Sequence, residues 1–287
     1  MIIEELKSLI NISSVQNKSN LYIRSLLKEF LQVYVLNYIY LNPNYNKNFL
    51  FTGGTCLRHC FGLNRLSEDL DFDLKNEIDA NNLKSSIEAY FKTEFMYDGL
   101  QVSILQKGRQ LLLKFPVLKE LKLATESESD LLYIKLDMSL MASKIYNQNS
   151  TLKSINNFNY LVTHYDLPTL FASKIVTILT RQRFLGKENI NVVKGRDYFD
   201  LLWFLDKKVI PNLDRINDLL ESSYTTTDIV GLVDEKVQIA TTISRQYFKQ
   251  DLLPFIDNHL ILDGYIENFA KNYNQNKSYL CYTTSTA

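Results

Sequence analysis

Hydrophobic residues recur along the first half of the chain with two different periods. Residues 19–41 and 80–95 carry apolar side chains at helical spacing, and the first of these segments stops before Asn42-Pro43, so both are predicted to be helices. Alternating apolar and polar positions predict strands at 49–51, 69–74 and 131–140, with a hairpin over 100–115 that turns at Lys107-Gly108. A short helix is expected between the first two strands.

The pattern changes after a polar segment at 147–159. Beyond it strand alternation is weak, and helical spacing predicts helices at 167–183, 196–205, 212–222, 228–248 and 260–272. The chain therefore has the pattern of an α+β protein with two domains. We expect a mixed domain containing a sheet over residues 1–155 and a C-terminal helical bundle over residues 156–287.

Composition and charge limit the partners and the compartment that can be expected for this chain. The 287 residues have a formal net charge of zero, so any contact with nucleic acid must use a local patch. Three cysteines are too few for a disulfide framework and favour a reducing compartment. The longest apolar stretch, 30–41, is interrupted by Gln32 and Asn37 and is shorter than the roughly 20 residues of a membrane span. We expect a soluble, cytoplasmic protein without a membrane partner.

The first candidate site is the turn Gly53-Gly54-Thr55, which follows a predicted strand and opens a predicted helix. Backbone N–H groups at such a helix start, together with the helix dipole, can hold phosphate. Glycine lets the phosphate approach the backbone closely. Taken alone, a Gly-Gly pair is more often only a turn.

Close behind this turn stand Asp69, Asp71 and Asp73, which alternate with apolar residues and therefore share one face of a strand. Carboxylates crowded in this way favour a cation, and Mg²⁺ carrying nucleotide phosphates is the natural candidate. A solvated edge strand is the simplest alternative. A calcium loop is excluded, because Leu74 stands where such a loop requires glycine and Ala80 where it requires glutamate.

A further carboxylate, Asp137, lies on the polar face of the predicted strand 131–140. If that strand neighbours the aspartate strand, three carboxylates converge, which suits metal-assisted phosphoryl or nucleotidyl transfer. An ordinary surface aspartate is an equally good reading of this residue.

The second domain offers a lysine, Lys174, in an otherwise apolar helix, and the run Arg196-Asp197-Tyr-Phe-Asp200. Asp197 and Asp200 share a helix face, and Arg196 with Asp200 could be no more than a surface pair contributing under about 1 kcal/mol. Five cations against one acid make the surrounding loop basic: Arg181, Arg183, Lys187, Lys194 and Arg196 against Glu188. Such a loop fits phosphate or RNA backbone, with a solvated loop as the alternative.

Together these motifs resemble the DNA polymerase β-like nucleotidyltransferase superfamily. More narrowly, the chain resembles the AbiEii/AbiGii-type toxins of bacterial toxin–antitoxin and abortive-infection systems. That family has a Gly-Gly-Thr/Ser turn followed by Arg-x-Ser-x-Asp-x-Asp, matched here by Arg65, Ser67, Asp69 and Asp71. Its later motifs, a helix lysine and then Arg-Asp-x-x-Asp-Leu, are matched by Lys174 and by residues 196–201.

The resemblance implies a polymerase β-like domain and a Mg²⁺- or Mn²⁺-dependent transfer of a nucleoside monophosphate from an NTP to an acceptor. It implies that Asp69 and Asp71 bind the metal, with Asp137 as the third carboxylate, and that Asp197 completes the catalytic set with Lys174. The residues it implies at the nucleotide are Gly53, Gly54, Thr55, Arg65, Ser67 and Lys174. Asp73 is not required by the family, and Asp200 is expected to brace its helix.

The resemblance also implies an RNA acceptor, the 3′ end of tRNA above all, and a cognate antitoxin whose direct contact stays open. Transfer to protein side chains is the nearer alternative, and a small-molecule acceptor is a more distant one. A nucleotide-sensing module without turnover is an alternative of a different class. We expect the site in a cleft between the two domains.

Overall fold

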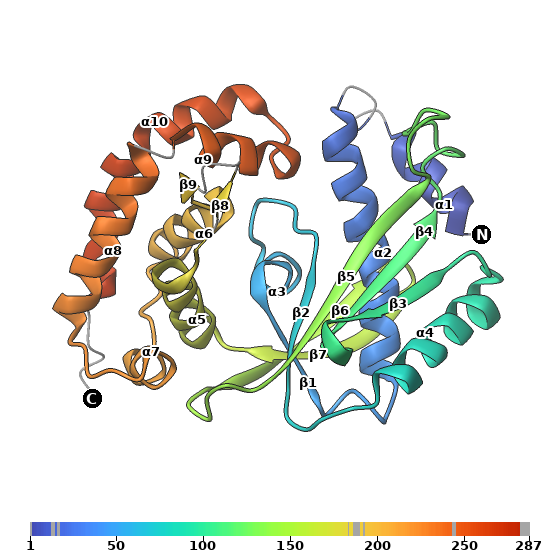
Figure 1. The fold of residues 1–287 in the computed structure, drawn as a ribbon, viewed down its shortest axis with the longest axis horizontal. Coiled ribbons are helices and arrows are strands. Elements are labelled where there is room, and N and C mark those ends of the chain that lie inside the picture. Colours follow the sequence, from blue (N-terminus) through green and yellow to red (C-terminus); the bar gives the residue numbers. More distant parts are fainter. Residues whose placement is uncertain are drawn as a thin grey trace. The chain divides into compact units, whose positions relative to one another are not determined.

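The computed structural model describes residues 2–12, 15, 18–182, 184–185, 190–191, 193–242 and 245–281. The chain divides into two compact units, which are described one at a time (Figure 1). The first unit comprises residues 1–141 and 148–164, and the second comprises 142–147 and 165–287.

The boundary between the units differs from the expected one at 155/156. The polar segment 147–159 does not separate domains, because it forms β6 (Gln148–Ile155) and the start of β7 (Phe158–Tyr165), and these two strands complete the sheet of the first unit. The chain therefore passes into the second unit after residue 164.

The described part of the first unit is built on a seven-stranded mixed sheet with the strand order β3-β4-β5-β2-β1-β7-β6. The remaining strands are β1 (Phe49–Thr52), β2 (Leu70–Leu74), β3 (Gln101–Leu105), β4 (Gln110–Pro116) and β5 (Leu131–Leu140). β2 runs antiparallel to β1 and parallel to β5. The predicted α+β class with a mixed sheet is confirmed, as is the hairpin β3–β4, which turns at Gln106–Gly108.

Four helices accompany the described part of this sheet: α1 (Ile2–Ile10), α2 (Asn20–Leu41), α3 (Gly53–Phe61) and α4 (Ala80–Phe95). One sheet face carries the buried apolar residues, and α2 and α4 cover it. The Phe91 ring of α4 lies 5.4 Å from Phe115 of β4, and the Tyr40 ring of α2 lies 6.5 Å from Phe72 of β2. The aspartates of β2 therefore point to the opposite face.

The second unit consists mainly of helices, which confirms the expected helical region. They are α5 (Leu167–Thr180), α6 (Gly195–Asp206), α7 (Leu213–Leu220), α8 (Thr226–Thr241), α9 (Arg245–Leu252) and α10 (His259–Asn276). The single helix predicted over 228–248 is wrong, since α8 and α9 are separate helices. A short strand pair, β8 (Phe184–Leu185) with β9 (Ile190–Asn191), was not predicted.

Aromatic stacking and one buried arginine hold the second unit together. Phe171 of α5 stacks on Phe204 of α6 with ring centroids 4.5 Å apart, and both side chains are fully buried. Arg215 of α7, also buried, donates from Nη1 to the carbonyl oxygen of Ile145 at 2.9 Å and from Nε to Ser173 Oγ at 3.1 Å. The contact with Ile145 explains why residues 142–147 belong to this unit.

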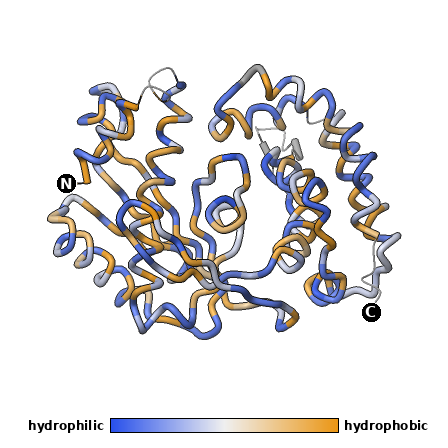
Figure 2. The backbone as a smooth tube through the Cα atoms, turned by 180° about the vertical axis from the view of Figure 1, so that it is seen from behind, coloured by the Kyte–Doolittle hydropathy of each residue, from blue (hydrophilic) through white to orange (hydrophobic). Residues whose placement is uncertain are grey.

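Hydrophobic and hydrophilic stretches alternate along the backbone of both units, as expected for amphipathic elements around a core (Figure 2). Among the described residues, no helix combines the length and the apolar character that crossing a membrane would require.

Replacing Phe204 by Ala should lower the free energy of unfolding of the second unit by about 3 kcal/mol or more, because it removes a fully buried aromatic partner of Phe171 and leaves a cavity. Urea denaturation followed by the fluorescence of Trp203, the single tryptophan of the chain, measures this change. Ile261→Ala is the matched control, since the Ile261 side chain is 64% exposed. An equal unfolding midpoint for the two variants would contradict this account of the core.

Candidate active site

The glycine turn lies at the junction of β1 and α3, where α3 begins at Gly53. Gly53 has φ +74°, and a Cβ added there would come 2.1 Å from Asp71 Oδ2. A Cβ on Gly54 would come 2.7 Å from Arg65 Nη2. Both positions therefore require glycine, because the first turn of α3 is seated directly against the aspartate strand and the buried arginine.

The start of α3 has the features of a site that can bind an anion. Among the described residues, Thr52 makes no capping hydrogen bond from its side chain. The first N–H groups of a helix lack partners within the helix, and the helix dipole adds positive charge there. The Asp71 carboxylate is adjacent to this turn, so the groups predicted to bind phosphate and metal lie side by side.

Buried hydrogen bonds hold the turn and the aspartate strand together from behind. The fully buried Thr55 hydroxyl lies 2.8 Å from Ser67 Oγ and donates to the carbonyl oxygen of Asp69. Arg65, only 3% exposed, donates from Nη1 to the carbonyl oxygen of Leu66 at 2.9 Å. The side chains of Thr55, Arg65 and Ser67 are thus buried and engaged within the protein.

Gln32 of α2 is a supporting residue that the sequence motifs did not identify. Its side chain is fully buried, and Nε2 donates to the carbonyl oxygens of Ser67 at 3.2 Å and Glu68 at 2.8 Å. These bonds fix the backbone immediately before Asp69. The signal was present in the sequence as a polar residue in the middle of an apolar helical stretch.

The carboxylates come from two neighbouring strands. β2 and β5 pair in parallel, with Asp71 directly opposite Asp137, so the two strands are neighbours. Neighbouring strands lie about 4.8 Å apart, and Asp69 precedes Asp71 by two residues on the same side. Gln110 of β4 donates from Nε2 to Asp137 Oδ1 at 2.5 Å, which orients that carboxylate.

In the part of the chain that the structure describes, no three histidine, cysteine, aspartate or glutamate side chains are gathered closely enough to hold a metal ion by themselves. Magnesium at nucleotide sites usually takes one or two carboxylates, while phosphates and waters supply the other ligands. Asp71 and Asp137 opposite each other, with Asp69 beside them, are oxygen donors of the kind that Mg²⁺ and Mn²⁺ prefer. The residues present therefore fit a metal that arrives with a nucleotide.

The second unit contains a buried ion cluster between α5 and α6. Lys174 Nζ lies 2.9 Å from Asp197 Oδ1 and 2.8 Å from Asp200 Oδ2, and Arg181 contacts the other oxygen of Asp197. The shared helix face of Asp197 and Asp200 is confirmed by their common partner. The reading of Arg196 and Asp200 as a surface pair is wrong, since Asp200 is fully buried and Arg196 contacts Asp251, with Nε 3.3 Å from Oδ2.

Burial and the neighbouring charges shift the pKa values of Asp197 and of the nearby Lys194. Burial alone would raise the pKa of Asp197, but Lys174 and Arg181 outweigh it and lower that pKa to about 2. Burial, followed by the nearby Arg196 and Arg181, lowers the pKa of Lys194 to about 8. Of the predicted basic loop, Arg183, Lys187 and Glu188 lie outside the described residues.

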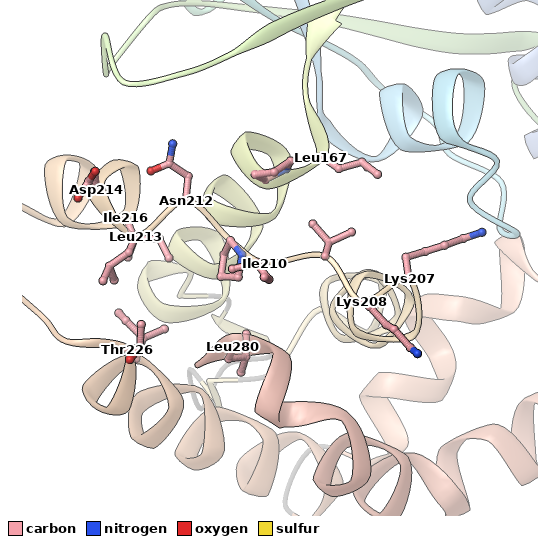
Figure 3. A pocket seen from close by; sticks show the side chains of 14 residues that line it. Leu167, Lys207, Lys208, Ile210, Asn212, Leu213, Asp214, Ile216, Thr226 and Leu280 are labelled. Atoms are coloured by element: carbon pink, nitrogen blue, oxygen red, sulfur yellow. The ribbon is translucent and has the colours of Figure 1, made fainter. Parts of the chain in front are cut away.

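A pocket of about 760 Å³ lies elsewhere in the second unit, beside α7 (Figure 3). Mostly apolar side chains line it, among them Leu167, Ile210, Ile216 and Leu280. None of the predicted site residues takes part, so we do not assign the chemistry to this pocket.

A known protein family matches most of the chain. The model of the AbiEii family, described as nucleotidyl transferase AbiEii toxin of type IV toxin–antitoxin systems, matches residues 35–270. MenT4, a nucleotidyltransferase toxin of Mycobacterium tuberculosis, is 13% identical and superposes with a TM-score of 0.54, covering 97% of this chain and 90% of its own. At that identity the likeness establishes a shared fold.

JHP933 of Helicobacter pylori is 16% identical, with a TM-score of 0.44 over 89% of this chain and 96% of its own. No curated protein sequence matches the chain.

Replacing Asp197 by Asn should lower the free energy of unfolding by about 2 kcal/mol at pH 7, because the pKa of this buried carboxyl is depressed from its ordinary value to about 2 in the folded protein. A depressed pKa stabilises above the unfolded value near 4, and the contribution is lost as pH falls from there towards 2. The urea unfolding midpoints of wild type and variant, measured at pH 7, 4 and 3, should therefore move closer together as the pH falls.

Asp218→Asn is the control for this prediction, since Asp218 is an exposed aspartate on α7. Its effect on the unfolding midpoint at pH 7 should be small. A stability gap for Asp197→Asn that stays constant from pH 7 to 3 would show that charge pairing does not stabilise the cluster.

Proposed function

Because this chain belongs to the AbiEii family of nucleotidyltransferase toxins from type IV toxin–antitoxin systems, we propose that it transfers a nucleoside monophosphate from an NTP to RNA, with the 3′ end of tRNA as acceptor. The observation that carries this proposal is the contact of Gly53 with the Asp71 carboxylate, which itself lies opposite Asp137. It joins a phosphate-binding helix start to metal-binding oxygens.

The NTP phosphates bind at the start of α3. The backbone N–H groups of Gly53, Gly54 and Thr55 donate to phosphate oxygens, and the helix dipole favours their negative charge. Thr55, Arg65 and Ser67 act as positioning residues, because their side chains are buried and hold the turn against the aspartate strand. Gln32 supports the same strand through the backbone of residues 67 and 68.

Asp69 and Asp71 hold Mg²⁺, with Asp137 as the third carboxylate. When bound, the ion would supply positive charge that stabilises the negative charge developing on the leaving pyrophosphate. The acceptor hydroxyl attacks the α-phosphorus, and the bond from that phosphorus to the bridging oxygen breaks. Gln110 keeps the Asp137 carboxylate oriented during this step.

Lys174 contacts the triphosphate and is the catalytic cation of the second unit. Its side chain is 13% exposed, and Asp197 with Asp200 keeps the ammonium charged and in place. Asp197 in turn stays ionised, because its pKa is lowered to about 2. Asp200, fully buried, braces α6 against α5.

The acceptor and the reaction are tested by labelling. The protein is incubated with each α-labelled NTP, Mg²⁺ and total RNA or cell extract, beside Asp69→Ala and a sample containing EDTA. Label should enter RNA with wild type, and both the substitution and metal removal should lower it at least a hundredfold, because metal-assisted attack is lost. A matched control is Asp218→Asn, a carboxylate removed from an exposed surface of α7.

Each result of this experiment decides between the functions. Label in protein instead of RNA would replace the RNA acceptor by protein side chains. The absence of any Asp69-dependent transfer would contradict the proposed reaction. If NTP binding were retained, that result would favour a nucleotide-binding module without turnover.

Gly53→Ala should abolish transfer, because its Cβ would overlap the Asp71 carboxylate at 2.1 Å. Gly62→Ala is a closely matched control: Gly62, at the end of α3, has φ +75°, and among the described residues nothing lies within 4 Å of an added Cβ. Each substitution carries a backbone cost of about 1 kcal/mol. Labelling assays with unfolding midpoints measure both effects, and comparable residual activity in the two variants would refute the role given to this contact.

A further inference from the structure

The sheet face that carries Asp71 and Asp137 continues along β5 and β4 with a different chemistry. On β5, Tyr133, Lys135 and Asp137 are each two residues apart and share this face. Opposite Tyr133 and Lys135 on β4 stand Lys114 and Leu112, while Gln110 stands opposite Asp137. Away from the carboxylates the face therefore becomes basic and aromatic.

This part of the face is accessible. Tyr133 is 38% exposed, Lys135 is exposed and Lys114 is half-buried. The intervening residues of β5, Leu132, Ile134 and Leu136, are buried on the opposite face, the one that α2 and α4 cover.

The two lysines also keep their charge available. In the described part of the chain, neither Lys114 nor Lys135 forms an ion pair or a side-chain hydrogen bond. Three acids of the neighbouring segment 117–130 already have basic partners: Glu120 with Lys7, Glu126 with Lys119, and Glu128 with Arg24. Lys114 and Lys135 therefore place two positive charges on this part of the face, although the whole chain is neutral.

We propose that Tyr133, Lys135 and Lys114, which we call the acceptor patch, bind the single-stranded 3′ end of an RNA acceptor. This inference rests on the proposed transfer to RNA and names the surface that would recognise it. Cations that follow the phosphate backbone, combined with an aromatic ring on which a base can stack, are the usual means of binding single-stranded nucleic acid without sequence preference.

The spacing fits the end of a strand whose terminal hydroxyl lies at the carboxylates. Asp137 follows Tyr133 by four positions along β5, a distance of about 13 Å at the rise of a β-strand. At 3.4 Å per stacked nucleotide this is roughly four nucleotides. The terminal hydroxyl lies at Asp71 and Asp137, Lys135 and Lys114 bind the phosphates upstream, and a base stacks on Tyr133.

The patch favours RNA over a protein acceptor. A polypeptide has no regular series of phosphates for two unpaired lysines to bind. Bases held in a duplex are already stacked and paired, so the patch also distinguishes a single-stranded end from a double helix.

Binding is measured apart from catalysis, in the Asp69→Ala protein without NTP. The probe is a fluorescein-labelled single-stranded 12-nucleotide RNA, with the same strand in a blunt duplex as comparison, and fluorescence anisotropy gives Kd over a series of salt concentrations. In this background we compare Tyr133→Ala, Tyr133→Phe and the double variant Lys114→Gln/Lys135→Gln. Lys92→Gln, an exposed lysine on α4, is the matched control for lost charge.

Tyr133→Ala should weaken binding of the single strand about tenfold or more, while Tyr133→Phe keeps the ring and should bind like the parent. The double lysine variant should lower the slope of log Kd against log salt by about 1.4, because each phosphate contact in a single strand contributes about 0.7. Lys92→Gln should leave Kd and slope unchanged.

Parental affinity in Tyr133→Ala, together with a parental salt slope in the double lysine variant, would overturn the patch. So would an Asp69→Ala parent that binds the duplex as tightly as the single strand. Labelling of RNA by the otherwise wild-type protein is read separately. If RNA is labelled while the patch variants bind and react normally, the patch fails and the proposed function stands. If only protein is labelled, and Tyr133→Ala lowers that labelling, the surface docks a protein and the proposal is wrong.

Discussion

The close approach of the first turn of α3 to Asp71 is the constraint on which the candidate site of the first unit depends. Gly53 and Gly54 leave no room for a side chain, because the Asp71 carboxylate and the Arg65 guanidinium occupy the space. The helix start proposed to bind phosphate and the strand proposed to bind metal are thereby held at fixed separation. The buried Thr55 hydroxyl, bonded to the segment before β2, makes the same connection from behind. Any change that moves α3 moves the carboxylates with it.

In the second unit, several charged side chains are buried and must be compensated by partners. An isolated ammonium or carboxylate as buried as Lys174, Asp197 and Asp200 would be costly, and burying charge is tolerated when partners compensate it. Here one lysine neutralises two aspartates and Arg181 adds a second cation at Asp197. The cluster therefore need not stabilise the fold more than apolar residues would. Its value lies in fixing a charged lysine at a defined position.

Contiguous motifs were the predictable part of this protein. The glycine turn and the aspartate strand could be predicted from residue type and spacing, whereas Lys174 and Asp197 of the second unit were singled out through the resemblance to the AbiEii/AbiGii-type family. The sequence predicts glycine at this turn because phosphate must approach the backbone closely. The structure adds a second reason, since a side chain at Gly53 would overlap the Asp71 carboxylate. The role of Gln32 was hidden, because it depends on a contact with residues 67 and 68, far along the chain.

The misses in the fold have a similar origin. β6 is an edge strand with exposed residues on both faces, Leu152 being 69% exposed, so it lacks the alternation that marks a strand and was read as a linker. The apolar spacing continues from α8 into α9, with Val233, Val237 and Phe248 all buried, so periodicity gave no sign of a break between the helices. Arg196 was paired with Asp200 because the sequence does not reveal which side of α6 faces α5.

The contrast between the units bears on which anions the protein can select. A ligand that binds Lys174 must compete with two carboxylates already within 3 Å of the ammonium. A singly charged anion gains little in that exchange, whereas a polyphosphate brings several charges. If Lys174 contacts the triphosphate as proposed, these ion pairs favour triphosphates over single phosphates. The preference for an NTP would then arise from charge that the folded second unit already holds in balance, rather than from an open basic surface.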